Sequence, residues 1–391
     1  MKQYKVAVVT GTRAEYGLLS RVIFRIETEA NLELQLIVTG SHLSEAHGET
    51  VKEIEKNGVA IYAKIPILKY ESTPYGTAQT TGYAIQEFAK YFNENRVDVV
   101  LVLGDRFEIF AVVTAAAVLG IPIAHISGGD VTLGAQDEFF RHAITKMAKL
   151  HFPSNEESAT RLCRMGEEPF RTFNVGGLGD ENIRRAEFYT KEQLEVGLQF
   201  ALNTPFALIT FHPETIEGTN PKMQMQELLS AMNAFPEMTL LFTKANADAG
   251  GEEINRMLDE YCENRENAIA VPSLGLKRYL SAMSLCDLVI GNSSSGVVEA
   301  PTFKKPVVDI GNRQSGRHRS ENVIHCEAVK DEIVTAVNIA LSEEFAEAAK
   351  KAISIYDGGD TSGKIVEILK KWLDENTFAK PKLFYDGGLL E

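Results

Sequence analysis

The stretch from Val97 to Ser127, VDVVLVLGDRFEIFAVVTAAAVLGIPIAHIS, decides the fold class of this chain. An apolar, β-branched run at Val97–Leu103 is followed by a segment of helical period at Phe107–Leu119 and by a second apolar run at Ile121–Ser127. This succession is typical of parallel strands joined by a crossover helix. The stretch therefore predicts an α/β protein built on a parallel sheet.

The same alternation extends toward the N-terminus. Lys5–Thr10 and Glu33–Thr39 have the composition of strands, and Tyr83–Glu94 has helical period. Strands and helices that alternate in this way build a sheet with helices on both faces. We therefore predict that the first half of the chain forms a doubly wound sheet.

The pattern restarts after a glycine cluster at residues 176–179. A chain of 391 residues also exceeds the length at which a single hydrophobic core stops growing. Both observations favour a second α/β domain, although the same glycines would also fit a strand end inside one larger sheet. The expected strands are Phe206–Phe211, Thr239–Thr243, Leu288–Gly291 and Pro306–Ile310, and Lys364–Trp372 is expected to form a terminal helix.

Composition and charge exclude several classes of function. The formal net charge of -14 argues against a sequence-independent grip on nucleic acid, which needs clustered Lys and Arg. The four cysteines lack any metal-ligand spacing, so we expect no metal site and reduced thiols. Neither a signal peptide nor a run of about 18 apolar residues is visible, which predicts a cytoplasmic protein without a membrane span.

Polar clusters follow the predicted strands of the first half, where ligands of parallel sheets bind. Arg13 lies in a glycine turn and fits either an anion site or a surface ion pair. Asp105 fits either a helix N-cap or a catalytic carboxylate, and Asp130 lies on a Gly-Gly turn where aspartate is ordinarily structural. Asp137 and Arg141 share one helix face, so they form either a salt bridge or a cleft acid tuned by an arginine.

The second half carries three further clusters at strand ends. His212 fits a phosphate donor, a proton-transfer group or a structural histidine. The turn from Gly291 to Gly296 combines glycine with small hydroxyl residues, which lets a diphosphate approach backbone amides, and Glu299 follows at a spacing that suits a ribose. Arg313 belongs to a run of three arginines that suggests a small polyanion. We expect the ligand in a cleft between the two domains.

Nicotinamide and ATP sites are not indicated. The spaced glycines of a dinucleotide fingerprint are absent, and so is the lysine-serine pair of a P-loop. We therefore expect no cofactor.

Seven motifs taken together resemble the hydrolysing UDP-N-acetylglucosamine 2-epimerases of sialic acid synthesis. They span about residues 5–320, in order and with compatible spacing: GTRAEYG, LGDRFE, DEFFRHAITK, FHPET, NADAG, GNSSSG with the following Glu-Ala-Pro, and GNRQSGR. The resemblance implies a GT-B fold of two Rossmann-like domains facing a central cleft. The first is residues 1–175, joined by the C-terminal helix in 361–391, and the second, residues 176–360, binds UDP.

The resemblance also implies a reaction and its residues. UDP-N-acetylglucosamine and water would give N-acetylmannosamine and UDP, without metal or cofactor, in a homodimer or homotetramer. Catalytic positions are Asp105, Asp137 and Arg141, with His212 and Asp130 as further candidates. The substrate contacts implied are Arg13, Gly17, Arg106, His212, Asn246, Leu274, Ser293, Ser294, Glu299 and Arg313.

One departure from the family pattern affects the chemistry. Many relatives have a catalytic glutamate at the position of Ser127, so Asp130 or Asp137 is expected to take that role. Three alternatives stay open: a sister epimerase acting on UDP-2,4-diacetamido-2,4,6-trideoxyglucose for legionaminic acid synthesis, a GT-B glycosyltransferase, and a non-catalytic nucleotide-sugar sensor.

Overall fold

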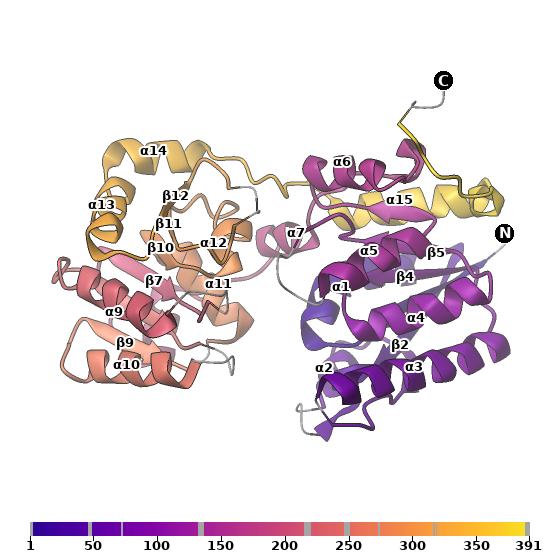
Figure 1. The fold of residues 1–391 in the computed structure, drawn as a ribbon, viewed down its shortest axis with the longest axis horizontal. Helices are drawn as coiled ribbons and strands as arrows, with labels where there is room; N and C mark the ends of the chain where they lie inside the picture. The colour runs from indigo at the N-terminus through magenta and orange to yellow at the C-terminus, as the bar shows by residue number, and fades with distance from the viewer. Residues whose placement is uncertain are drawn as a thin grey trace. The chain divides into compact units, whose positions relative to one another are not determined.

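The computed structural model describes residues 3–45, 49–71, 73–131, 137–214, 220–245, 251–272, 274–315, 317 and 319–387. The chain divides into two compact units (Figure 1). The first unit comprises residues 1–182 and 358–391, and the second comprises residues 183–357.

The first unit contains a six-stranded parallel sheet with the order β3-β2-β1-β4-β5-β6. Its strands are β1 (Tyr4–Thr10), β2 (Leu32–Thr39), β3 (Ile61–Ile65), β4 (Val99–Leu103), β5 (Ile123–Ile126) and β6 (Leu150–Phe152). Its helices are α1 (Arg13–Thr28), α2 (Val51–Lys56), α3 (Pro74–Glu94), α4 (Phe107–Val118), α5 (Asp137–Met147), α6 (Glu156–Arg164) and α15 (Thr361–Asp374). The boundary between the two units, after Asn182, falls within α7 (Leu178–Arg184). Single 3₁₀ turns lie at Gly40–Leu43, Pro169–Arg171 and Thr377–Ala379.

The second unit repeats the same architecture. Its parallel sheet has the order β12-β11-β10-β7-β8-β9. Read from β9, this order is β9-β8-β7-β10-β11-β12, which corresponds strand by strand to the order in the first unit. The strands are β7 (Phe206–Thr210), β8 (Thr239–Thr243), β9 (Ala268–Val271), β10 (Leu288–Gly291), β11 (Val307–Ile310) and β12 (Val323–Cys326). The helices are α8 (Lys191–Leu198), α9 (Pro221–Met232), α10 (Gly251–Glu263), α11 (Gly275–Leu285), α12 (Ser294–Val298), α13 (Lys330–Ala340) and α14 (Glu343–Lys351).

Two doubly wound sheets confirm the predicted fold class. Each strand expected from the sequence is present, with ends that differ by at most two residues. Alternation along β1 shows why both faces must be covered, because successive side chains point to opposite sides of a sheet. Val6 and Val8 belong to the core under α1 and α15, whereas Ala7 and Val9 belong to the core under α3 and α4.

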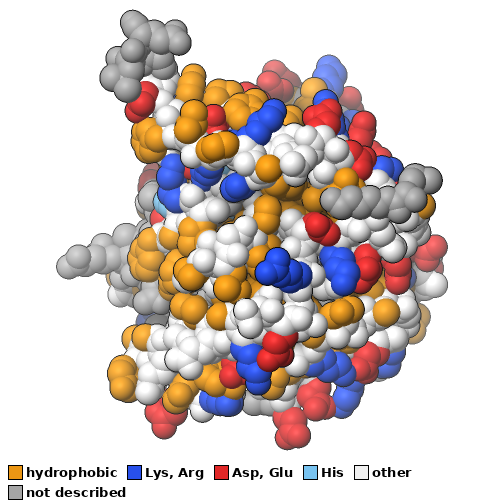
Figure 2. Space-filling view, turned by 90° about the vertical axis from the view of Figure 1, so that its right-hand side faces the viewer, with side chains coloured by type: hydrophobic (Ala, Val, Ile, Leu, Met, Phe, Trp, Pro, Cys, Tyr) orange, Lys and Arg blue, Asp and Glu red, His pale blue; other side chains and the backbone are white. Residues whose placement is uncertain are grey.

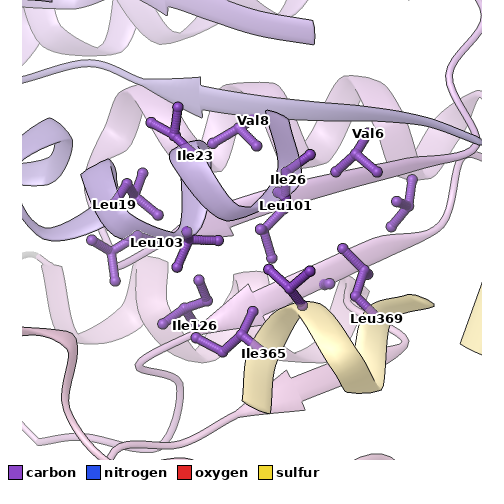
Figure 3. Packing of buried hydrophobic residues seen from close by; sticks show 14 of the residues in the cluster. Val6, Val8, Leu19, Ile23, Ile26, Leu101, Leu103, Ile126, Ile365 and Leu369 are labelled. Carbon is purple, nitrogen blue, oxygen red and sulfur yellow. The ribbon is translucent and has the colours of Figure 1, made fainter. Parts of the chain in front are cut away.

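The terminal helix α15 completes the first of these cores. Figure 3 shows side chains from β1, α1, β4, β5 and α15 in one apolar cluster, among them Val8, Ile26, Leu101, Ile365 and Leu369. The start of the helix is fixed by Glu181, whose carboxylate accepts from the Ser362 backbone nitrogen at 2.7 Å and from its hydroxyl at 2.9 Å.

The packing of α15 can be tested with Leu369→Ala. Leu369 is fully buried, so truncation should remove apolar contacts and leave a cavity, at a cost of about 2–5 kcal/mol in the free energy of unfolding. Urea denaturation measures it. Glu367→Ala on the exposed face of the same helix is the control, expected to change the free energy by less than about 0.5 kcal/mol. Equal effects of the two substitutions would contradict the packing described.

Candidate functional site

Each sheet has one topological switch point, at β1 and β4 in the first unit and at β7 and β10 in the second. Ligands of open α/β sheets bind outside the carboxyl ends of the strands at such points. The segment 104–108 follows β4, and the turn 291–296 includes the end of β10. The clusters selected from the sequence therefore lie where each sheet offers a binding position.

Arg141 of α5 brings acidic groups of the first unit together. Its guanidinium donates to the carboxylate of Asp105, to Glu138 Oε2 at 3.0 Å and to the backbone oxygen of Asp130 at 2.9 Å. The Arg141 side chain is only 5% exposed, so these charge-assisted bonds form largely out of water and exceed a surface ion pair in strength. The pairing seen thus joins the end of β4 to α5.

Asp137 begins α5 and is half-buried. Burial raises the pKa of Asp137, and the negative charge of Asp105 raises it further, while Arg106 and Arg141 oppose the shift. A carboxyl whose pKa lies closer to the working pH can both accept and release a proton during a reaction. This environment suits a general acid or base.

Asp130 lies in a different environment. Its Oδ1 accepts from the hydroxyl of Ser158 at 2.6 Å and from that of Ser154 at 3.1 Å. These bonds favour a structural role, as expected for an aspartate on a turn. Nearby, Ser127 has a φ of 61°, in the left-handed region that non-glycine residues seldom adopt. Asp130 and Asp137 were the candidates for the role of the glutamate that many relatives have at the position of Ser127. Of these two, we therefore propose Asp137.

His125 of β5 is a buried residue whose role the sequence did not reveal. Its Nε2 lies 2.8 Å from the carbonyl oxygen of Gly104, and its Nδ1 lies 3.3 Å from the hydroxyl of Thr145 on α5. Burial lowers the pKa of His125 to about 3, so the ring is neutral, donates to Gly104 and accepts from Thr145. His125 thus connects the turn before Asp105 to the helix that carries Arg141. A histidine in an apolar strand gives no sequence signal of such a bridge.

The glycine turn after β1 does not offer all of its amides to a ligand. The backbone nitrogens of Gly11 and Thr12 donate to Glu15 Oε2 at 2.7 and 3.0 Å. The side chain of Arg13 pairs with Glu53 at 2.9 Å and is largely exposed. A carboxylate of the protein accepts from these two amides, and Arg13 forms a surface ion pair, which was the alternative to an anion site; a substrate contact of Arg13 stays a prediction.

Two other predicted contacts belong to the first unit. Arg106 forms a two-pronged bond to the buried Glu108, at 3.2 Å from Nε and 3.0 Å from Nη2. Gly17 lies in α1, and its carbonyl accepts from Asn182 at 3.0 Å. A side chain at Gly17 would meet no atom within 4 Å, so this glycine faces open space.

In the second unit, the ends of three neighbouring strands carry His212, Ser293 and Arg313. The side chain of Asn292 bonds the backbone of His212, and the guanidinium of Arg313 donates to the carbonyl oxygen of Asn292 at 3.1 Å. The structure thus brings together the ends of three strands, although His212 precedes Ser293 and Arg313 by about 80 and 100 residues.

The remaining predicted contacts of the second unit follow β10 or lie near it. Ser293 caps α12 and Ser294 begins it. Glu299 ends this helix, and its Oε2 is buried without a hydrogen bond among the described residues. Burial raises the pKa of Glu299, and ribose hydroxyls would supply the missing donors. Leu274 is buried at the start of α11, and Asn246, with the rest of the NADAG motif, lies outside the described residues.

The basic run after β11 divides in the structure. Arg319 donates to the buried Asp309 at 2.8 Å, which commits it to the protein itself. Arg313 lies against the β10 turn instead. Of these two arginines predicted to bind a small polyanion, only Arg313 therefore contacts the turn after β10.

Neither a metal site nor a membrane span is present among the described residues. No group of His, Cys, Asp and Glu has an arrangement suited to a metal ion. None of the described helices is both long and apolar enough to cross a membrane.

Paired Rossmann-like sheets with arginine, serine and carboxylate groups at their strand ends define the class of nucleotide-sugar enzymes of GT-B-like fold. Residues 25–370 match the model of the UDP-N-acetylglucosamine 2-epimerase family. The chain belongs to this family, which confirms the resemblance drawn from the seven motifs.

The relatives cover nearly the whole chain. A GDP/UDP-N,N'-diacetylbacillosamine 2-epimerase (hydrolyzing) of Campylobacter jejuni is 40% identical over 84% of this chain and 85% of its own. Polysialic acid biosynthesis protein P7 of Escherichia coli is 35% identical over 98% and 97%. A UDP-N,N'-diacetylbacillosamine 2-epimerase (hydrolyzing) of Legionella pneumophila is 34% identical over 94% and 95%.

Solved structures agree on the fold. A UDP-GlcNAc 2-epimerase from Neisseria meningitidis bound to UDP-GlcNAc matches with a TM-score of 0.74 and 18% identity, over 94% of this chain and 100% of that one. A putative UDP-N-acetylglucosamine 2-epimerase from Listeria monocytogenes matches with a TM-score of 0.78 and 17% identity, over 95% and 97%. At these identities the likeness establishes the architecture alone.

The carboxylate in the β1 turn predicts a pH dependence of stability. Burial raises the pKa of Glu15 to about 7. The folded state then binds more protons than the unfolded state, so stability falls as the pH rises from an ordinary carboxyl pKa toward 7 and is level above it. Glu15→Gln keeps an acceptor for the two amides and abolishes this titration.

Urea unfolding at pH 5, 6, 7 and 8 measures the difference. Relative to Glu15→Gln, the wild type should lose up to roughly 3 kcal/mol across this range. Parallel stability profiles of the two proteins would refute the assignment.

Proposed function

We propose that this enzyme is a hydrolysing 2-epimerase whose substrate is UDP-N,N'-diacetylbacillosamine, that is UDP-2,4-diacetamido-2,4,6-trideoxyglucose. Two of the relatives above 30% identity bear names that state a hydrolysing 2-epimerase of this sugar, linked to UDP in one name and to GDP or UDP in the other. UDP-N-acetylglucosamine is the second candidate, supported by the family description and by a 29% identical UDP-N-acetylglucosamine 2-epimerase of Neisseria meningitidis. The motifs had favoured UDP-N-acetylglucosamine as the substrate and the diacetamido sugar as the alternative. We reverse this preference because the relatives at 40% and 34% identity are named for the diacetamido sugar.

The observation that carries the reaction is the buried Arg141 between carboxyl groups. The hydrogen at carbon 2 of the sugar has no adjacent carbonyl to acidify it, so inversion by a free carbanion is unfavourable. Elimination avoids this: the C2–H and C1–O bonds break, UDP leaves and a glycal forms. A carboxyl with a raised pKa such as Asp137 suits this proton transfer.

Hydration completes the reaction. Water adds across the double bond of the glycal, its oxygen to carbon 1 and a proton to carbon 2 from the other face, which leaves the sugar with the manno configuration. Asp105 and Asp137 are the proposed acid and base, and Arg141 fixes the position and charge of Asp105.

The leaving group is assigned to the second unit. Two glycine-containing turns already bind carboxylates of the protein. The turn after β1 donates to Glu15, and the turn after β11 donates to Glu214. The Ser293–Ser294 turn is therefore the best place for the diphosphate, with His212 and Arg313 beside it and Glu299 for the ribose. Groups placed beforehand around a departing diphosphate lower the barrier to its departure.

The assembly and location of the enzyme complete the proposal. On the face drawn in Figure 2, hydrophobic side chains gather toward the left, and charged side chains dominate toward the right. Val118 on α4 and Phe139 on α5 are 84% and 60% exposed. Such apolar exposure fits a homodimer or homotetramer, which sedimentation of the 43.2 kDa chain measures. Cytoplasmic location stays a prediction.

One assay decides the reaction and the sugar. Pure protein is incubated with each UDP-sugar and no acceptor, and NMR follows UDP and the free sugar. We expect UDP with 2,4-diacetamido-2,4,6-trideoxymannose from the diacetamido substrate. N-acetylmannosamine as the faster product selects UDP-N-acetylglucosamine. Binding without turnover indicates a sensor, and UDP release only with an added acceptor indicates a glycosyltransferase.

The choice of Asp137 rather than Asp130 as the proton-transfer group has its own test. Asp137→Asn should lower kcat by about 100-fold or more, because general acid–base groups contribute roughly 10²–10⁴. Asp130→Asn retains an oxygen that accepts from Ser154 and Ser158, so we expect at most about a tenfold loss. Steady-state UDP release measures both variants. Near-full turnover of Asp137→Asn would show that another residue transfers the proton.

A further inference from the structure

The amide of Asn292 joins two strand-end loops of the second unit. Its Oδ1 accepts from the backbone nitrogen of His212 at 2.7 Å, and its Nδ2 donates to the carbonyl oxygen of His212 at 2.8 Å. Both backbone groups of His212 are thus bonded by one rigid, planar side chain. Asn292 is fully buried, so this pairing fixes where the chain leaves β7.

The backbone of Asn292 receives a third loop. Its carbonyl oxygen accepts from Arg313 Nη1 at 3.1 Å and from Gln314 Nε2 at 2.9 Å. Gln314 is 3% exposed, so its bond is shielded from water. The loop after β11 is thereby tied to the turn after β10.

Glu214 closes the network from the other side. Its Oε1 accepts from the backbone nitrogens of Asn312 at 2.8 Å and Arg313 at 3.2 Å. Gly311 has a φ of +74°, and a Cβ there would lie 2.4 Å from Glu214 Oε1. The turn therefore wraps around the carboxylate so closely that only glycine fits, as in an anion nest.

A nest filled by its own carboxylate cannot take a ligand phosphate through its amides. What it offers to a ligand is the side chain of Arg313, whose backbone Glu214 holds directly. The imidazole of His212 is placed in the same way through Asn292. The positions of Arg313 and His212 are thus set by Glu214 and Asn292, whose side chains are buried.

We propose that Glu214 and Asn292 are positioning residues that preorganise Arg313 and His212 for the diphosphate of the substrate. The inference rests on the proposed function, because it takes UDP as the ligand. Neither residue needs to touch UDP. Their loss should therefore weaken UDP binding and raise KM, while kcat at saturating substrate falls less.

Glu214 can be tested with a pair of substitutions. Glu214→Ala removes the acceptor of two backbone amides, so the dissociation constant of UDP, measured by calorimetry, should rise at least tenfold. Glu214→Gln keeps an acceptor oxygen, and Gln224, whose Oε1 lacks a hydrogen bond in the described structure, can turn its amide to accept from the new nitrogen. The glutamine should restore the affinity to within about threefold of wild type.

Asn292 has a matched control in the same unit. Asn322 is also fully buried, and its Nδ2 donates to the carbonyl oxygen of Lys305 at 2.8 Å, but it lies at the amino end of the edge strand β12, whereas Asn292 follows the carboxyl end of β10. Asn292→Ala should raise the dissociation constant of UDP at least tenfold. Asn322→Ala should lower the melting temperature as well, yet leave the dissociation constant within twofold of wild type.

The outcomes separate the two hypotheses. A wild-type protein that does not bind UDP overturns the proposed function and this inference with it. UDP binding by the wild type, with unchanged binding by folded Glu214→Ala and Asn292→Ala, overturns the inference alone. If alanine at either position prevents folding, Gln314→Met, which removes one donor to the β10 turn, must weaken UDP binding by at least threefold for the inference to stand.

Discussion

Backbone amides at the carboxyl ends of parallel strands must find acceptors, and the architecture of both units depends on which acceptor each one finds. After β1 the acceptor is Glu15, and after β11 it is Glu214. These carboxylates are buried, so the turns they hold are fixed and shielded from water. A third turn, after β10, is built around serine hydroxyls and is the one assigned to a diphosphate. The turns after β1 and β11 are thus capped by carboxylates of the protein itself, whereas the turn after β10 is the one that we propose for the diphosphate.

The same constraint organises the acidic groups of the first unit. Arg141 is buried and needs charged partners, and its bonds to Asp105 and Glu138 satisfy this need. Asp137 remains half-buried beside them with a raised pKa. Asp105 is thus held by a direct bond to the guanidinium, and Asp137 is the carboxyl that we propose for the proton transfer.

Much of the fold was predictable because central strands of a parallel sheet are continuous apolar runs. Every strand named from such a run is present. The strands that were not named lie at sheet edges or are short: β12 is largely half-exposed, and β6 has three residues. Edge strands are partly solvated, so they lack the apolar signal that identifies a central strand.

The sequence by itself determined the architecture, the family and the polar residues that follow the strands, because these depend on local periodicity and on motifs. The tertiary structure decided which of those residues are available. Arg13 and Arg319 bond carboxylates of the protein, Asp130 is held by serines, and His125 bridges two elements. Such partners come from distant parts of the chain, and burial sets the strength of each bond. Availability is a property of three-dimensional packing that spacing along the chain does not encode.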